Sequence, residues 1–163
     1  EFTVTVRKDG GRLGFAVETL YADYCVTRKV EDFSPLKTTV KPYDRLVRVN
    51  GDTGKASALA KKVAENNELE LIFQRPVMKE ILLEKAGKKA GFRLDPPSEQ
   101  MNTMGLLIKG LEEGAASEMP AGTFNVMDRI CAVDGQEGSL AELLEMLQKD
   151  RVVLTVCSYD MPS

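Results

Sequence analysis

Arg12-Leu13-Gly14-Phe15 is the stretch that decides how this chain folds, and it leads into Ala16-Val17. A charged run and a glycine pair precede it, which is typical of a loop between two strands. Gly14 lacks a Cβ, so its backbone can take strained angles and lie close to a ligand. Neighbouring N–H groups at such a turn can hold an anion, and Leu13, Phe15 and Val17 alternate on one side of the strand. An anion nest beside an apolar pocket suits the C-terminus of a peptide.

The same pattern occurs again in the second half of the chain. Ala90-Gly91-Phe92-Arg93-Leu94 repeats the order of apolar residue, glycine, phenylalanine, any residue and apolar residue. An Asp-Arg strand that closes in a turn follows each copy, at residues 44–51 and 128–135, and a helix follows each turn. The sequence therefore predicts two similar halves of roughly 80 residues, each able to bury a modest core.

Hydrophobic periodicity predicts the elements of each half. In the first half we expect strands at residues 2–6, 24–30, 41–51 and 69–73, a strand that begins at the Gly-Phe stretch, and a helix at 56–66. In the second we expect the corresponding strands, including 81–83, 105–111, 126–135 and 152–156, and a helix at 139–149 that opens with a Ser139–Glu142 capping box. Short helical turns are expected at Ser34-Pro35-Leu36 and Glu113-Gly114-Ala115-Ala116, a polar loop at 98–103, and a loose tail at 158–163.

Composition narrows the classes of function. The 163 residues carry a net charge of −3 with no concentrated basic face, so we expect no nucleic-acid partner. The chain has no histidine, which excludes Ser-His-Asp or Cys-His catalysis and any His-ligated metal, and we expect no cofactor. The three cysteines are odd in number and lack CxxC spacing, so we expect reduced strand residues in an intracellular protein. Because the chain begins at Glu1, we expect a fragment of a longer protein.

Both halves resemble PDZ domains. The resemblance rests on the Gly-Phe loops, the "DRLVRVNG" and "DRICAVDG" strands and the helix after each, and it covers about residues 2–74 and 78–157. It implies a mainly β fold with α (α+β): two PDZ-like, partly open antiparallel β-barrels, each capped by two helices, at residues 1–75 and 77–158. The short Arg75-Pro76 junction is similar to that of syntenin-like tandem-PDZ adaptors.

The resemblance also implies site residues, with the ligand added as a strand between the second strand and the long helix of each half. The backbone expected to hold the peptide carboxylate belongs to Leu13, Gly14, Phe15, Ala90, Gly91 and Phe92. The expected side-chain pockets add Val17, Ala60, Val63, Leu94, Leu140, Leu144 and Leu147. Many PDZ domains carry histidine where Leu140 falls, so Leu140 favours an apolar ligand residue; in the first half Ala56 or Ser57 could take this position. We expect the second groove to bind more tightly.

The implied function is a non-catalytic scaffold or adaptor that binds the C-terminal tails of partner proteins, membrane proteins above all. The expected location is the cytoplasm, at the inner face of the plasma membrane. One alternative is a peripheral membrane module that binds phosphoinositides, with Lys85, Lys88 and Lys89 as contacts. Another is a regulatory PDZ pair cut from a larger protease or signalling enzyme, whose catalytic part would lie elsewhere.

Overall fold

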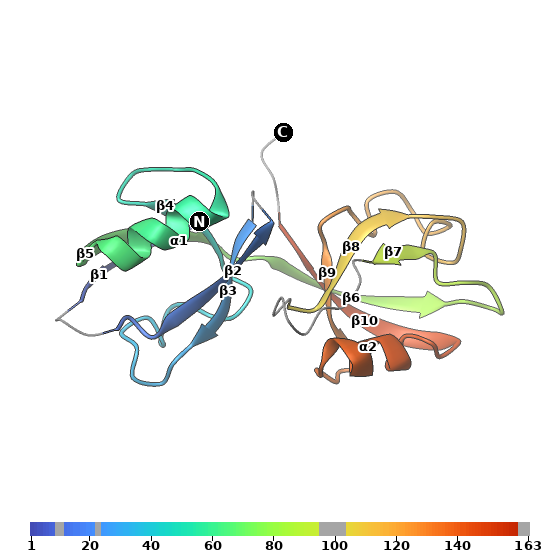
Figure 1. The fold of residues 1–163 in the computed structure, drawn as a ribbon. Coiled ribbons are helices and arrows are strands. Elements are labelled where there is room, and N and C mark those ends of the chain that lie inside the picture. The colour runs from blue at the N-terminus through green and yellow to red at the C-terminus, as the bar shows by residue number, and fades with distance from the viewer. Residues whose placement is uncertain (9–11, 22–23, 95–103, 160–163) are drawn as a thin grey trace. The chain divides into compact units, whose positions relative to one another are not determined.

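The chain forms two compact units, Glu1–Pro76 and Val77–Ser163. The computed structural model describes residues 1–8, 12–21, 24–94 and 104–159 (Figure 1). Each unit has its own sheet, helix and hydrophobic core, and each is considered by itself.

The first unit contains one antiparallel sheet of five strands in the order β1-β5-β4-β3-β2. Its elements are β1 (Phe2–Arg7), β2 (Phe15–Tyr21), β3 (Tyr24–Val30), β4 (Arg45–Val49), α1 (Ala56–Glu65) and β5 (Glu68–Gln74). β1 and β2 form the two edges of this sheet, so one side of the β2 backbone has no strand partner among the described residues. The predicted strands and long helix of this half are confirmed, except that the strand expected at 41–51 is limited to Arg45–Val49, because the chain turns before it at Tyr43, with φ of 76°, and after it at Asn50.

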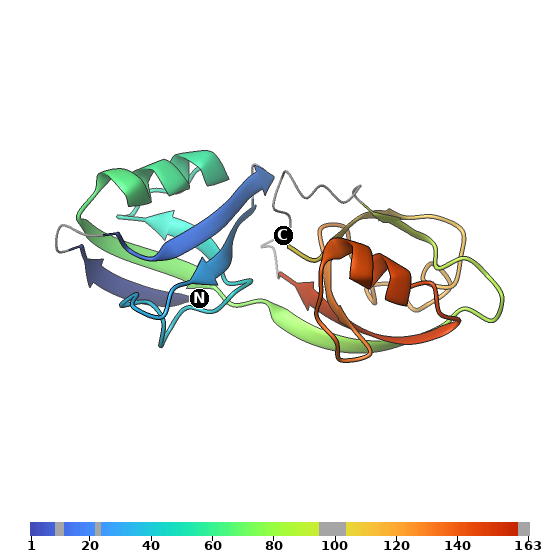
Figure 2. The same cartoon turned by 60° about the horizontal axis from the view of Figure 1, so that its bottom comes forward.

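The second unit repeats this topology, with the strand order β6-β10-β9-β8-β7. Figure 2 shows its long helix in orange-red. Its elements are β6 (Val77–Glu84), β7 (Phe92–Leu94), β8 (Leu106–Leu111), β9 (Arg129–Val133), α2 (Leu140–Met146) and β10 (Arg151–Ser158). β7 occupies the edge that β2 occupies in the first unit, which confirms the predicted internal repeat.

Alternation along the strands builds each core. Leu69, Leu71 and Phe73 of β5 are fully buried while their neighbours Glu68 and Glu70 face solvent. The equivalent strand β10 buries Val152, Leu154 and Val156 in the same way. Burial of one such aliphatic or aromatic side chain contributes about 1.5–3 kcal/mol. β5 pairs with the edge strand β1, and β10 pairs with the edge strand β6, so this burial fixes one edge of each sheet.

The two predicted tight turns have the same backbone geometry. Asn50 and Gly51 have φ of 50° and 82°, and Asp134 and Gly135 have φ of 51° and 75°. Positive φ at both central residues matches the twist of the flanking strands, which is why Asn-Gly and Asp-Gly are favoured there. The confirmed turns close the Asp-Arg strands and direct the chain into the long helices.

The capping box at the start of α2 is confirmed, but the predicted end of this helix is wrong. The Ser139 Oγ accepts a hydrogen bond from the Glu142 N–H at 3.2 Å and donates to Glu142 Oε1 at 3.0 Å. The helix ends at Met146 instead of Lys149, with Leu147 as its C-cap. Beyond it, Gln148 and Lys149 continue in i→i−3 bonds, which form turns and not α-helix.

Other expectations need correction. Among the described residues each unit has one α-helix, so the expectation of two capping helices is wrong. The stretch around Leu36 forms consecutive hydrogen-bonded turns and no α-helix: the Lys37 N–H donates to the Ser34 carbonyl at 3.1 Å, and the Val40 N–H donates to the Leu36 carbonyl at 2.8 Å. Pro42 disfavours helical angles at the residue before it, and so limits this turn. The stretch around Ala116 is likewise a turn, and Pro120 follows it. We expected partly open barrels, and the structure has two antiparallel sheets of five strands whose described strands end at separate edges without closing.

The expectation of a loose tail is wrong at its start. Ser158 is the last residue of β10, and Tyr159 keeps only 8% of its surface exposed. Residues 160–163 and the polar loop predicted at 98–103 lie outside the described part of the chain.

Candidate functional site

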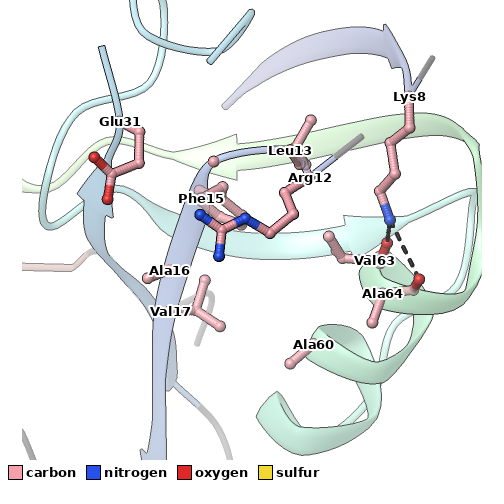
Figure 3. Close-up of a pocket in the computed structure, with 11 residues that line it drawn as sticks. Lys8, Arg12, Leu13, Phe15, Ala16, Val17, Glu31, Ala60, Val63 and Ala64 are labelled. Carbon is pink, nitrogen blue, oxygen red and sulfur yellow. Dashed lines mark hydrogen bonds between the residues drawn. The ribbon is translucent and has the colours of Figure 1, made fainter. Parts of the chain in front are cut away.

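A cavity of about 570 Å³ lies between β2 and α1 in the first unit, and we call it the first groove (Figure 3). This volume is in the usual range for a ligand pocket. The structure brings together at this groove all the residues that the sequence predicted for the first half: Leu13, Gly14, Phe15, Val17, Ala60 and Val63. It adds residues that sequence reasoning missed: Lys8, Arg12, Ala16, Glu31 and Ala64.

The Gly-Phe turn has the geometry that requires glycine. Gly14 has φ of +71°, and its carbonyl accepts a hydrogen bond from the Glu31 N–H at 2.7 Å. A Cβ at this position would lie 2.8 Å from a ring carbon of Phe33 and 3.2 Å from the Glu31 Cβ. Phe33 is 63% exposed, so its ring covers the turn from the solvent side. The turn is thus held against the end of β3, at one end of the groove.

The walls of the first groove are apolar. Phe15 and Val17 are half-buried against the core, and Phe15 meets the core residue Phe73 edge-to-face at 5.8 Å between ring centroids. On the other side, α1 presents Ala60, Val63 and Ala64 (Figure 3). Ala64 follows Ala60 by four residues and so lies on the same face of the helix, and this spacing could have predicted its place in the groove.

Two cations border the groove at its turn. The Lys8 ammonium donates to the carbonyl of Val63, and to that of Ala64 at 3.3 Å, so it caps the last turn of α1. A positive charge is favourable at a helix C-terminus because it offsets the helix dipole. Arg12 is exposed, lines the groove and is directed toward β2 (Figure 3). Glu31 also lines the groove and pairs with Lys29 at 3.3 Å, so Lys8 and Arg12 give the lining residues an excess of one positive charge.

The second unit places its predicted residues on corresponding elements. Ala90, Phe92 and Leu94 from the β7 side, and Leu140 and Leu144 from α2, are half-buried and pack against the core, and Leu147 is 7% exposed. Gly91 has φ of +87°, and its carbonyl accepts the Glu112 N–H at 2.9 Å, as that of Gly14 does from Glu31. These six apolar residues pack against one core, and we call the surface that they form, the sequence counterpart of the first groove, the second groove.

The lysines suggested for lipid contact lie in a different setting from the one expected. Lys85 is only 8% exposed, and its ammonium donates to the Leu147 carbonyl at the end of α2. Burial lowers the pKa of Lys85, and the charge of Asp150 opposes that effect. Lys88 pairs with Glu118 at 2.7 Å, and Lys88 and Lys89 line a hollow with Glu112, Glu113 and Glu118. This arrangement disfavours an anionic head group, because carboxylates outnumber the ammonium groups.

The described residues offer few other chemical sites. They contain no group of three His, Cys, Asp or Glu side chains that could hold a metal ion. Within the same ranges no helix is long and apolar enough to cross a membrane. Cys25, Cys131 and Cys157 are buried thiols outside any disulfide and are located in strands, as predicted.

Comparisons with known proteins give similarity at the level of structure. No protein-family profile matches the chain, and no curated protein does. The chain is similar to INAD PDZ45 in complex with NG2 peptide, with 18% identity and a TM-score of 0.39 over 98% of this chain and 89% of that one. It is also similar to INAD PDZ45 in complex with NORPA CC-PBM, with 14% identity and a TM-score of 0.42 over 99% and 95% of the two chains. Similarity at this level does not establish a family.

Proposed function

We propose that the chain is a pair of PDZ-like modules that bind the C-terminal peptides of partner proteins and so act as a scaffold. The observation that carries this proposal is the first groove, where an edge strand and a helix border an apolar cavity with a positive-φ glycine turn at one end. An extended peptide can pair with the free side of β2, so that main-chain hydrogen bonds supply affinity and alternate side chains supply selectivity.

The turn end of the groove is suited to the terminal carboxylate. Backbone N–H groups of Leu13, Gly14 and Phe15 are the proposed donors, with Arg12 as a nearby charge. A hydrogen bond to a charged acceptor contributes about 1.5–3 kcal/mol, against about 1 kcal/mol for a neutral one. The last ligand side chain would then lie between Phe15 and Val17 on one wall and the α1 residues on the other.

The second groove supports the same mode. β7 is an edge strand, α2 packs against β8 and β9 as α1 packs against β3 and β4, and Gly91 repeats the turn of Gly14. Leu140 at the start of α2 would meet the ligand residue two before the terminus, and its apolar side chain favours an apolar residue there. No residue is assigned a catalytic role in this proposal.

The test compares free-acid and amidated forms of C-terminal peptides by calorimetry on the whole chain. A screen of free C-terminal peptides supplies the ligand, and NMR titration assigns it to one groove. We expect amidation to weaken binding about tenfold or more, because the charged acceptor is lost.

Two variants of α1 test whether the peptide binds in the first groove. Ala60→Glu puts a carboxylate on the α1 wall and should abolish binding to the first groove, while Ala58→Glu, on the exposed side of the same helix, should not. Equal affinity for acid and amide, or loss of binding in both variants, would contradict the proposal.

A further inference from the structure

The helix walls of the two grooves differ in size. Lys8 bonds the carbonyl of Val63 at the end of α1, and Lys85 bonds that of Leu147 at the end of α2. These matching contacts align Val63 with Leu147, and three residues earlier they align Ala60 with Leu144. The alignment also pairs the two most buried leucines of the helices, Leu59 at 3% exposure and Leu143 at 1%, which supports it independently.

This alignment gives the first groove the smaller side chain at each aligned helix position. Ala60 stands where the second groove has Leu144, and Val63 stands where it has Leu147. Ala64 also lines the first groove, so two of the three residues that α1 presents there are alanines. The cavity of about 570 Å³ is therefore open on its helix side.

The strand walls do not reverse this difference. Phe15 and Phe92 are equivalent, and Val17 is smaller than its counterpart Leu94. Leu13 is larger than its counterpart Ala90, but it is 7% exposed and belongs to the core, so most of its bulk lies beneath the groove. The room for a ligand in the first groove thus lies between Phe15 and the alanines of α1.

We propose that the two grooves select different C-termini: the first takes a peptide whose last side chain is large, aromatic above all, and the second takes one whose last side chain is small and aliphatic. This rests on the proposed function and specifies its ligands. An aromatic ring would fill the space beside Ala60 and contact the Phe15 ring, and aromatic pairs are favourable beyond the area that they bury. In the second unit the larger Leu144 stands at the aligned helix position, packed against the core, and would leave less room for a ring.

The experiment uses two peptides that are identical except for a final Phe or Val. Both are titrated into the whole ¹⁵N-labelled chain, and shifts of the amides at residues 13–17 and 90–94 report the two grooves separately. We expect the Phe peptide to bind the first groove about tenfold or more tightly than the Val peptide, since loss of even a few methylene-sized groups from an apolar pocket has an effect of this size. The second groove should show the reverse order.

Reciprocal variants sharpen the test. Ala60→Leu should lower the affinity of the first groove for the Phe peptide about tenfold and leave its affinity for the Val peptide within about twofold. Leu144→Ala should let the second groove accept the Phe peptide. Ala58→Leu makes the same substitution on the exposed side of α1 and should change neither affinity.

The outcomes separate this inference from the proposed function. Equal binding of both peptides by each groove, or unchanged selectivity in Leu144→Ala, would overturn the size selection and leave peptide binding intact. Failure of both peptides and of all free C-termini to bind either groove would overturn the proposed function itself.

Discussion

The two Gly-Phe turns have the same backbone but different neighbours. Gly14 and Gly91 both have positive φ, and both carbonyls accept a bond from the N–H of the glutamate that comes directly after the neighbouring strand, β3 or β8. Above Gly14 lies the ring of Phe33, which is mostly exposed, whereas Gly91 lies against the backbone of Glu112 and Gly114. The same turn is thus covered by a movable side chain in the first unit and by fixed main chain in the second.

The largest effect expected from this comparison is on stability. Gly91→Ala would place a Cβ 2.8 Å from the Glu112 carbonyl oxygen and 3.0 Å from the Gly114 Cα. A left-handed non-glycine residue already costs about 1–2 kcal/mol, and the backbone contacts add to it, so we expect the second unit to lose about 3 kcal/mol or more. For Gly14→Ala we expect about 1–2 kcal/mol, because the Phe33 ring can rotate away.

Residue-resolved NMR during urea denaturation of the whole chain measures both losses. Gly110→Ala is the control, since a Cβ there would meet only Arg93 Nη1 at 4.0 Å and φ is not positive. Similar losses for Gly14→Ala and Gly91→Ala would refute the difference between the two turns.

A second difference concerns the buried aspartates, Asp44 and Asp128. Each accepts a backbone N–H from three residues earlier at 2.9 Å, from Lys41 and Asn125 respectively. Asp44 is then paired with Arg75 at 3.0 Å, while Asp128 accepts the Ser158 hydroxyl at 2.7 Å. One unit therefore compensates its buried carboxylate with a charge and the other with a neutral donor.

Removing these partners should give a smaller effect than the glycine change. Arg75→Met should destabilise the first unit by about 2 kcal/mol, and Ser158→Ala should destabilise the second by about 1 kcal/mol, because each leaves a buried carboxylate oxygen without its donor. Since Arg75 is about half exposed, salt screens its pair. The difference in unfolding free energy between wild type and Arg75→Met should therefore shrink as the salt concentration rises. The difference between wild type and Ser158→Ala should stay constant. The same salt dependence for both variants would argue against this contrast between the two aspartates.

The smallest expected effect is a pH dependence confined to the second unit. Burial lowers the pKa of Lys85 below its ordinary value of 10.5, so the unfolded chain binds this proton more tightly than the folded one. Below the folded pKa, the charged Lys85 lowers the free energy of unfolding of the second unit by its full amount. This loss is relieved as the pH rises from the folded pKa toward 10.5, so the second unit should become more stable over that pH range. Lys85→Met should abolish the gain, as seen in urea midpoints of the two units between pH 7 and 10; a gain that persists in the variant would exclude Lys85 as its source.

Local sequence signals predicted much of this structure. The alternating strands, the Asn-Gly and Asp-Gly turns and the Ser139 capping box depend on residues close together in sequence. The first groove joins residues 13–17 to residues 60–64, which are far apart in sequence, and its prediction came from the resemblance to PDZ domains. The lysine contacts to the helix ends could not be predicted, because Lys8 lies 55 residues from Val63 and Lys85 lies 62 residues from Leu147. The end of α2 depends on which backbone carbonyls of its last turn accept hydrogen bonds from distant residues such as Lys85, and the sequence does not show these bonds.

The buried cysteines give each unit its own reporter of opening. Cys25 lies in β3 at 1% exposure, and burial raises the pKa of its thiol to about 12, so it is protonated and shielded at neutral pH. Only the thiolate reacts readily with a disulfide reagent or a maleimide. Cys25 should thus be labelled only when the first unit opens, and Cys131 and Cys157 only when the second does. The rates of thiol modification therefore report how often each unit opens, and both can be measured in one protein without any substitution.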